Sequence, residues 1–256
     1  MVIVAVCNQK GGVGKTTVAV NLAYRLDPGE RRRNLVIDAD PQGNATTICG
    51  IELAPQDLTL NDALAAVASG SPASHAKDAI RVASDAWNMD VMPSNRLLAS
   101  RETDVSLGRE SRLQAIIEAV KDDYGHIVID CPPSLGMLTT NALVAADKAL
   151  IVTTPRETSV DGVAEMVNTI ATVRTHYNPR LTLAGILINE WRSDRVDRRL
   201  WAEALESYYH DYVLPRFIPE RESIAKACSA HTPITDEDTD VTTALNALVQ
   251  TLIEKG

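Results

Sequence analysis

The chain has 256 residues, of which 45% are hydrophobic, so it can form one sizeable α/β domain or two small ones, and we expect a single domain spanning residues 1–256. Its 25 basic and 34 acidic side chains give a formal net charge of −9. This charge excludes a global basic field that would draw the molecule to nucleic acid or anionic lipid, so any such contact requires a local patch.

The cysteine content favours a reducing compartment. No C-x-x-C pair is present, and each cysteine sits in or beside an apolar run, which predicts core residues at Cys7, Cys49, Cys131 and Cys228. The N-terminus is strand-like without a basic leader, and no apolar run approaches the length of a membrane span. The sequence therefore predicts a soluble cytoplasmic protein.

A glycine-rich segment lies between an expected strand and an expected helix. Residues 1–7 form a β-branched apolar run, and residues 18–26 show apolar helical periodicity. Between them, residues 10–17 read Lys-Gly-Gly-Val-Gly-Lys-Thr-Thr, and the glycines allow a tight curl that aims backbone N–H groups at phosphate oxygens. We expect the helix to start at Lys15, which reaches the phosphates, while the Thr16 hydroxyl completes a Mg²⁺ shell. The segment predicts nucleoside triphosphate binding.

This segment departs from the usual phosphate-loop pattern in one informative way. The pattern G-x-x-x-x-G-K-[ST] requires a glycine five residues before Gly14, where this chain has Gln9. Lys10 instead places a second ammonium beside the phosphates, which is the deviant Walker A pattern. A chance glycine-rich turn before a helix is the alternative.

Carboxylates follow two further expected strands. Residues 34–38 form a short buried strand that ends in Asp38 and is followed in the next turn by Asp40, at the edge where open parallel sheets bind ligands. One acid is suited to hold Mg²⁺ through water and the other to orient the attacking water; the alternative is an acidic surface turn. Residues 126–130 form a third strand ending on Asp130, which has Walker B character and would meet the Mg²⁺ shell. The following residues 131–134, Cys-Pro-Pro-Ser, predict an extended loop able to sense a γ-phosphate.

The remaining segments complete a mostly parallel, twisted sheet with helices on both faces. In residues 45–86, helical pieces such as 58–68 are expected to pack outside the sheet, followed by a strand at 89–92 and helices at 94–107 and 109–120. Residues 148–153 and 181–189 predict strands joined by a crossover helix at 157–176. Every expected phosphate or metal ligand then falls at one edge, which indicates an α/β P-loop NTPase.

Three segments, residues 8–17, 38–44 and 127–143, together resemble the ParA/MinD family of deviant Walker A ATPases, and are most similar to its ParA-type partition and positioning proteins. The resemblance covers nearly the whole chain. It implies ATP and Mg²⁺ as cofactors and slow, partner-stimulated hydrolysis of ATP to ADP and phosphate. It also implies a homodimer that sandwiches ATP, in which Lys10 reaches the partner's nucleotide.

The same resemblance assigns roles residue by residue. Lys10, Lys15 and Asp40 would serve catalysis, with Asp40 positioning the hydrolytic water, and Thr16, Asp38 and Asp130 would support the metal. The turn at residues 217–219 and a strand end would contact the adenine. The implied nucleotide-binding positions are Lys10, Gly11, Gly12, Val13, Gly14, Lys15, Thr16, Thr17, Asn189, Ile218 and Pro219.

ParA-type dimers coat nucleoid DNA without sequence preference, and a centromere-binding or adaptor protein stimulates their hydrolysis. Residues 191–199 offer a DNA patch, in which positions 192, 195 and 199 are spaced to share one helical face, although two aspartates halve its charge. A solvated helix face is the alternative. The arginines of the patch are Arg192, Arg195, Arg198 and Arg199.

Other functions remain open at this point. The MinD branch binds membranes through a basic amphipathic tail, whereas residues 242–256 carry only Lys255 as a cation and should pack against the domain. A metabolic ATP-dependent enzyme on the same scaffold, an iron–sulfur electron carrier and a DNA-binding scaffold with degenerate ATP chemistry are further alternatives, and the cysteines argue against the carrier. The cargo could be a plasmid, a chromosome region or a protein assembly.

Overall fold

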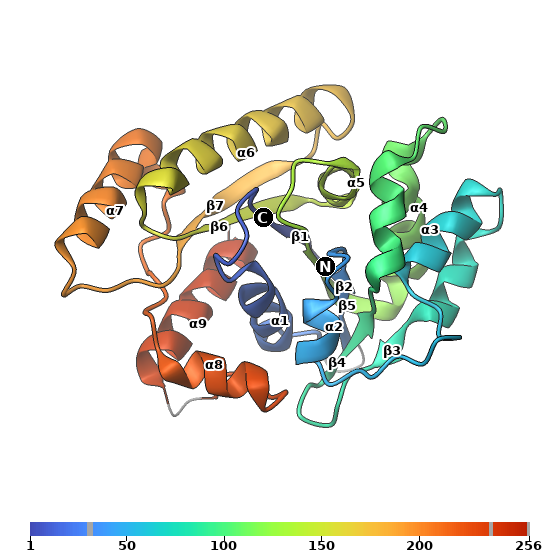
Figure 1. The fold of residues 1–256 in the computed structure, drawn as a ribbon, viewed down its shortest axis with the longest axis horizontal. Coiled ribbons are helices and arrows are strands. Elements are labelled where there is room, and N and C mark those ends of the chain that lie inside the picture. Colours follow the sequence, from blue (N-terminus) through green and yellow to red (C-terminus); the bar gives the residue numbers. More distant parts are fainter. Residues whose placement is uncertain (30–32, 236–237, 255–256) are drawn as a thin grey trace.

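The computed structural model describes residues 1–29, 33–235 and 238–254, and its strands form one seven-stranded sheet (Figure 1). The strand order is β3-β4-β2-β5-β1-β6-β7, and every pairing is parallel except that of β3 with β4. The strands are β1 (Ile3–Cys7), β2 (Arg33–Asp38), β3 (Arg81–Val82), β4 (Met89–Met92), β5 (Tyr124–Asp130), β6 (Lys148–Thr153) and β7 (Thr182–Ile188).

Both faces of the sheet are apolar and covered by helices, as continuous apolar strands require. In β1, Ile3, Ala5 and Cys7 face one core and Val4 and Val6 face the other. The first core packs against α3 (Leu60–Ala68), α4 (Arg112–Val120), α5 (Met137–Ala145), α6 (Glu157–His176) and α7 (Val196–Tyr209). The second packs against α1 (Lys15–Arg25), α2 (Asn44–Ile48), α8 (Glu222–Ser229) and α9 (Thr239–Glu254), as Figure 1 shows. The expected P-loop α/β fold is confirmed.

The segment between β2 and β5 differs from expectation. Part of it joins the sheet, because β3 pairs antiparallel with β4 at the edge, so it does not lie wholly outside. Instead of a helix over 94–107, there is a 3₁₀ helix at Arg96–Thr103, whose start is capped by the Asn95 side chain. The next helix begins with a 3₁₀ turn, Arg109–Ser111, and becomes α-helical only at Arg112. Other 3₁₀ turns lie at Ala73–Ala79, Lys121–Asp123 and His210–Tyr212.

The C-terminal helix packs against the domain as expected. Four of its side chains, Val241, Leu245, Leu248 and Leu252, are buried in the core that also contains the apolar face of α1. The buried Lys148 ammonium donates to the Leu252 carbonyl (2.6 Å), at the end of this helix where a cation is favourable. The last two residues of the expected helix, 255 and 256, lie outside the described part of the chain. No described helix is long and apolar enough to cross a membrane.

The strand order places the site. After β1 the chain moves to β2, then to the edge strand β3 and back to β4 on one side, returns through β5 next to β1, and then continues to β6 and β7 on the other side. Direction therefore reverses around β1, and in open parallel sheets the crevice at the carboxyl end of such a strand binds ligands. The glycine-rich segment emerges from this position.

Candidate functional site

The glycine-rich segment is a tight loop fastened to the end of β7. Gly12 and Gly14 adopt left-handed backbone angles, with φ of 70° and 86°. A Cβ at Gly14 would overlap the Asn189 side chain, whose Nδ2 donates to the Val13 carbonyl (2.9 Å). Glycine at position 14 is therefore required twice, by its backbone angle and by the close approach of Asn189.

Helix α1 begins at Lys15 with no side chain capping its first N–H groups. Unsatisfied N–H groups and the positive end of a helix dipole form an anion site. The Lys15 ammonium is buried and donates to the Lys10 carbonyl (2.8 Å), so it is held across the mouth of the loop. Burial lowers the pKa of Lys15, against the opposing effect of Asp130.

Asp38 and Asp130 lie opposite each other on the adjacent strands β2 and β5. Asp38 is hydrogen-bonded on both oxygens: Oδ2 accepts from the Thr46 N–H (2.8 Å) and hydroxyl (2.7 Å), and Oδ1 accepts from the Asp40 N–H (3.2 Å). Burial nonetheless raises the pKa of Asp38 to about 6. Its carboxylate holds the start of α2 against the strand end.

Asp130 is fully buried, and neither carboxylate oxygen has a hydrogen-bond partner of ordinary geometry among the described residues. The Thr16 hydroxyl is close enough to lower the pKa of Asp130, as does Lys15, but burial and Asp38 outweigh both and raise it well above its usual value. An orphaned buried carboxylate beside a hydroxyl is an oxygen donor set that suits Mg²⁺. The residues present therefore fit the metal that the sequence predicts.

Asp40 is the acid that reaches the cavity. It is mostly buried, its Oδ1 accepts the Gln42 N–H (2.9 Å), and it lines the same cavity as the phosphate loop. Asp38 and Asp130 lie beneath that surface and do not line the cavity. The three acids are thus arranged as one at the mouth and two below it.

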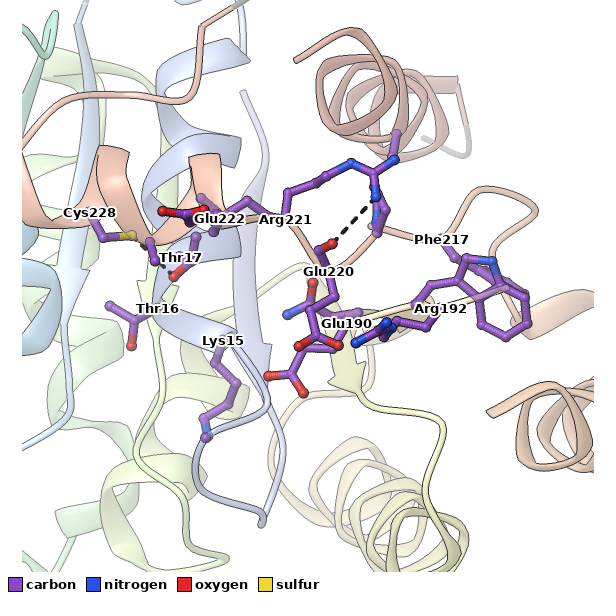
Figure 2. Close-up of a pocket in the computed structure, with 18 of the residues that line it drawn as sticks. Lys15, Thr16, Thr17, Glu190, Arg192, Phe217, Glu220, Arg221, Glu222 and Cys228 are labelled. Atoms are coloured by element: carbon purple, nitrogen blue, oxygen red, sulfur yellow. Dashed lines mark hydrogen bonds between the residues drawn. The ribbon is translucent and has the colours of Figure 1, made fainter. Parts of the chain in front are cut away.

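The cavity has a volume of about 1610 Å³, ample for a nucleotide. Figure 2 shows Lys15, Thr16 and Thr17 on one wall and Arg192 and Phe217 on the other. The loop contributes Gly11, Gly12, Gly14, Lys15, Thr16 and Thr17 to the lining, whereas Lys10 and Val13 are outside it. Six of the eight loop positions expected to bind nucleotide line the cavity, and the carbonyls of the other two accept hydrogen bonds from lining residues, Val13 from Asn189 and Lys10 from Lys15.

Two of the three positions expected at the adenine line the cavity, Asn189 beside the phosphate loop and Pro219 on the opposite wall. Phe217 also lines the cavity, and it stacks edge-on against Trp191 at 5.1 Å between ring centroids. Ile218 is instead buried, and its N–H donates to the Ile188 carbonyl (2.9 Å). This pairing presents the Pro219 side of the turn to the cavity.

The arginine segment does not form the expected helical face. Helix α7 begins only at Val196, so Arg192 and Arg195 precede it. The cause is pairing of Trp191 with the 217–219 turn, since the Trp191 N–H donates to the Ile218 carbonyl (2.9 Å), which holds this stretch extended.

The four arginines also differ in environment. Arg192 lines the nucleotide cavity and binds Asp194 (3.0 Å), and the side chain of Arg198 is only 15% exposed. Arg195 and Arg199 are exposed. These two are therefore the exposed members of the four, although Arg195 also lies within ion-pair distance of Asp194 (4.0 Å).

Several residues at the site escaped sequence reasoning. Thr46, which holds Asp38, and the Arg156–Glu190 ion pair (2.8 Å) at the cavity rim carry no motif signal. Glu190 follows the cavity residue Asn189 and has a left-handed φ of 53°. Cys228 lies 3.6 Å from the Thr17 hydroxyl and lines the cavity, so the expectation of a core residue is wrong for this cysteine, while the other three are buried.

The fold and the loop define a P-loop nucleotide-binding protein of the α/β class. A family model described as an AAA domain matches residues 1–183, and the chain belongs to this family, among its ParA/Soj-type ATPases. The expected family is confirmed.

Curated relatives share most of their length with this chain. The sporulation initiation inhibitor protein Soj of Bacillus subtilis (strain 168) is 38% identical over 234 residues, which cover 91% of this chain and 89% of Soj. The chromosome partitioning protein ParA of Caulobacter vibrioides (strain NA1000 / CB15N) is 34% identical over 238 residues, covering 91% and 85%. The chain is therefore similar to Soj and to a chromosome partitioning protein over most of its length.

A solved structure shares the architecture and contains a nucleotide. Cobyrinic acid a,c-diamide synthase from Mycobacterium smegmatis, with bound ATP analogue and magnesium, superposes with a TM-score of 0.83. The two chains are 28% identical, and the match covers 99% of this chain and 94% of that one.

Proposed function

We propose that this protein is a ParA-like positioning ATPase. It binds ATP with Mg²⁺, dimerises around the nucleotide, binds DNA without sequence preference in the dimeric state, and hydrolyses ATP when stimulated by a centromere-binding or adaptor protein. It acts on a plasmid, a chromosome region or a protein cargo in the cytoplasm, on the nucleoid. The observation that carries the proposal is the orphaned, buried carboxylate of Asp130 beside Lys15 and Thr16 under a glycine loop.

Nucleotide binding follows from this arrangement. The N–H groups of residues 11–17, which include the start of α1, donate hydrogen bonds to the phosphate oxygens. The Lys15 ammonium, which donates to the Lys10 carbonyl, would then donate to a phosphate oxygen instead. Thr16 and Asp130 would hold Mg²⁺, directly or through water, with Asp38 behind them. The metal, when bound, neutralises phosphate charge. Asn189, Pro219 and the neighbouring Ile218 turn form the base end.

Hydrolysis depends on water placed by Asp40. In the reaction, water attacks the γ-phosphorus, the bond to the bridging oxygen breaks, and ADP and phosphate leave. Asp40 is the one acid of the three that lines the cavity, and its backbone is fixed to Asp38. A carboxylate is a weak base, so it orients the water rather than removing its proton outright, which gives slow turnover without a partner.

A second function has a specific observation behind it. The 28% identity and TM-score of 0.83 to an ATP-dependent diamide synthase favour a metabolic enzyme on the same scaffold. Such an enzyme would bind ATP at the same loop but would not need DNA. The higher identities to Soj (38%) and to the chromosome partitioning protein ParA (34%) favour the positioning ATPase.

An ATP-dependent DNA retention assay tests the proposal. We expect the protein to be retained on non-specific duplex DNA with ATP and Mg²⁺, and to be released with ADP. Lys15→Ala should lose nucleotide binding and retention together. Asp40→Ala should keep ATP binding and retention while its hydrolysis falls by at least tenfold, and Glu118→Ala, on the surface of α4, serves as the matched control. Equal retention with and without ATP would contradict the proposal.

A further inference from the structure

One glutamate outside the nucleotide cavity is hydrogen-bonded both to the loop that follows Asp130, residues 131–136, and to the start of the next helix. Glu102, in the 3₁₀ helix Arg96–Thr103, accepts the Met137 N–H through Oε2 (2.5 Å). Its Oε1 accepts the Ser134 hydroxyl (3.3 Å). Met137 is the first residue of α5, so the carboxylate also lies at the positive end of that helix.

The loop of residues 131–136 follows Asp130 in the chain and contributes to the wall of the nucleotide cavity. Its first residue, Cys131, donates its N–H to the carbonyl of Val6 (3.1 Å) in β1, the strand that leads into the phosphate loop. Pro133 lines the cavity, and a Cβ at Gly11 would lie 3.8 Å from the Pro133 Cβ. A shift of residues 131–136 therefore moves a wall of the nucleotide site.

The segment that contains Glu102 is joined to helices α4 and α5 by an ion pair and hydrogen bonds. Asp104 forms an ion pair with the buried Arg112 at the start of α4. Asn141 of α5 accepts the Leu113 N–H (3.1 Å) and donates to the Arg109 carbonyl (2.8 Å). Helices α4 and α5 lie side by side in Figure 1, and these bonds join them to the Glu102 segment as one unit.

We propose that Glu102 is a positioning residue for ATP hydrolysis, which holds residues 131–136 against the phosphate loop. This inference rests on the proposed function. Nucleotide affinity comes from the loop and α1, which Glu102 does not touch, so its loss should leave affinity nearly unchanged. Turnover depends on geometry at the γ-phosphate, where a displacement of about 1 Å can cost up to about 100-fold in rate.

Gly136 offers an independent way to break the contact. Its backbone is extended (φ −79°), so alanine is compatible with it. A Cβ there would overlap the end of the Glu102 side chain, which is flexible and can swing away at little cost. Gly136→Ala should therefore release Glu102 without altering the phosphate loop, and its effect should disappear when Glu102 is already absent.

The experiment compares kcat, KM for ATP, fluorescent ATP-analogue affinity and thermal stability in Glu102→Ala, Glu102→Gln, Gly136→Ala, the Glu102→Ala/Gly136→Ala double variant and the control Glu118→Ala. We expect kcat to fall about tenfold or more in Glu102→Ala and Gly136→Ala, with KM and affinity within about threefold of wild type. The double variant should be no slower than either single variant. Glu102→Gln keeps an acceptor for the Met137 N–H and should regain most of the rate.

Each outcome decides between a positioning role and another explanation. Wild-type kcat in Glu102→Ala, or additive losses in the double variant, would overturn the proposal. If Glu102→Ala unfolds, Gly136→Ala and Glu102→Gln carry the test. If the wild-type protein does not hydrolyse ATP, the proposed function is contradicted whatever the role of Glu102. The Glu102–Met137 hydrogen bond is then tested separately, by hydrogen exchange of the Met137 amide. The exchange rate of this amide should rise in Glu102→Ala and not in Glu102→Gln. An unchanged rate in Glu102→Ala would show that Glu102 does not hold residues 131–136 in place.

Discussion

Two aspartates in register on neighbouring strands have become chemically different through their immediate neighbours. Asp38 has its oxygens saturated by backbone and hydroxyl donors, whereas Asp130 has none of ordinary geometry among the described residues. Leaving a buried charge without partners is costly, so Asp130 is the group with most to gain from a cation. Asp38, by contrast, is best suited to hold α2 and the backbone of Asp40 in place.

His126 provides a pH-dependent contribution to stability at the other end of β5. Its Nδ1 accepts the Val2 N–H (3.2 Å), and its Nε2 lies 3.1 Å from the Asp27 carbonyl oxygen, so the folded state requires the neutral ring with the proton on Nε2. Burial lowers the pKa of His126 below its ordinary value of 6.5. The unfolded chain therefore takes up the proton first as pH falls, and stability is lost below about pH 6.5.

We expect His126→Asn to flatten this dependence, because its amide oxygen can accept the Val2 N–H without titrating. Denaturant unfolding between pH 7.5 and 5 measures the effect, as the difference between wild type and variant. The difference is needed because Asp38, with its pKa raised to about 6, acts in the opposite sense and favours the folded state as pH falls. A difference that stays constant across this range would show that His126 does not contribute.

At the scale of elements, sequence reasoning succeeded where a pattern is local. The strands that end in Asp38 and Asp130 are continuous apolar runs, and the glycine loop has a fixed spacing, so their positions follow from the chain itself. Strand β3 is two residues long and is formed only by its pairing with β4, so it has no periodicity to detect. Helix α7 starts late because Trp191 pairs with a turn more than 25 residues further along the chain.

The candidate site likewise contains residues that the sequence predicts and residues that it does not. The phosphate loop and the carboxylates could be found from motif spacing, whereas Thr46, Glu102 and Cys228 reach the site from segments without a motif. Their contacts depend on how α2, α5 and α8 pack on the sheet. A single sequence does not encode such distances in any local pattern.

The C-terminal helix is a stabilising element of the second core, and this can be measured. Leu245 is 1% exposed and packs in the core shared with α1, so Leu245→Ala should lower the free energy of unfolding by about 2–5 kcal/mol. Gln250→Ala, on the exposed face of the same helix, should change it by less than about 0.5 kcal/mol. Urea unfolding gives both values. Equal, small effects would mean that the helix docks only loosely.

At the scale of the whole molecule, nucleotide and charge have to be considered together. The sheet brings the loop, the acids and the 217–219 turn to one edge, while the net charge of −9 opposes approach to DNA. The exposed arginines Arg195 and Arg199 are too few to overcome this in one copy. A dimer presents two such pairs, and linked weak contacts strengthen each other through effective concentration.

We expect ATP to control dimerisation, and with it the number of arginines presented to DNA, through Lys10. Lys15, not Lys10, lines the cavity of its own subunit, so the second lysine is not needed there and suits the phosphates of a partner copy. We expect Lys10→Ala to bind ATP yet remain monomeric in light scattering, with Lys15→Ala as the control that loses ATP itself. Normal ATP-dependent dimerisation of Lys10→Ala would remove Lys10 from this role.

The DNA contact should then be strongly salt-dependent and confined to the dimer. Because each neutralised phosphate adds about 0.9 to the slope of log affinity against log salt, a dimer using four arginines should show a slope near −3.6. Arg195→Glu combined with Arg199→Glu should dimerise with ATP but lose DNA, measured by fluorescence anisotropy at several salt concentrations. Arg174→Glu combined with Arg180→Glu, two exposed arginines at and just after the end of α6, makes the same charge change away from the patch and should retain most of the affinity. If the double variant bound as wild type does at every salt concentration, the surface that meets DNA would have to lie elsewhere on the dimer.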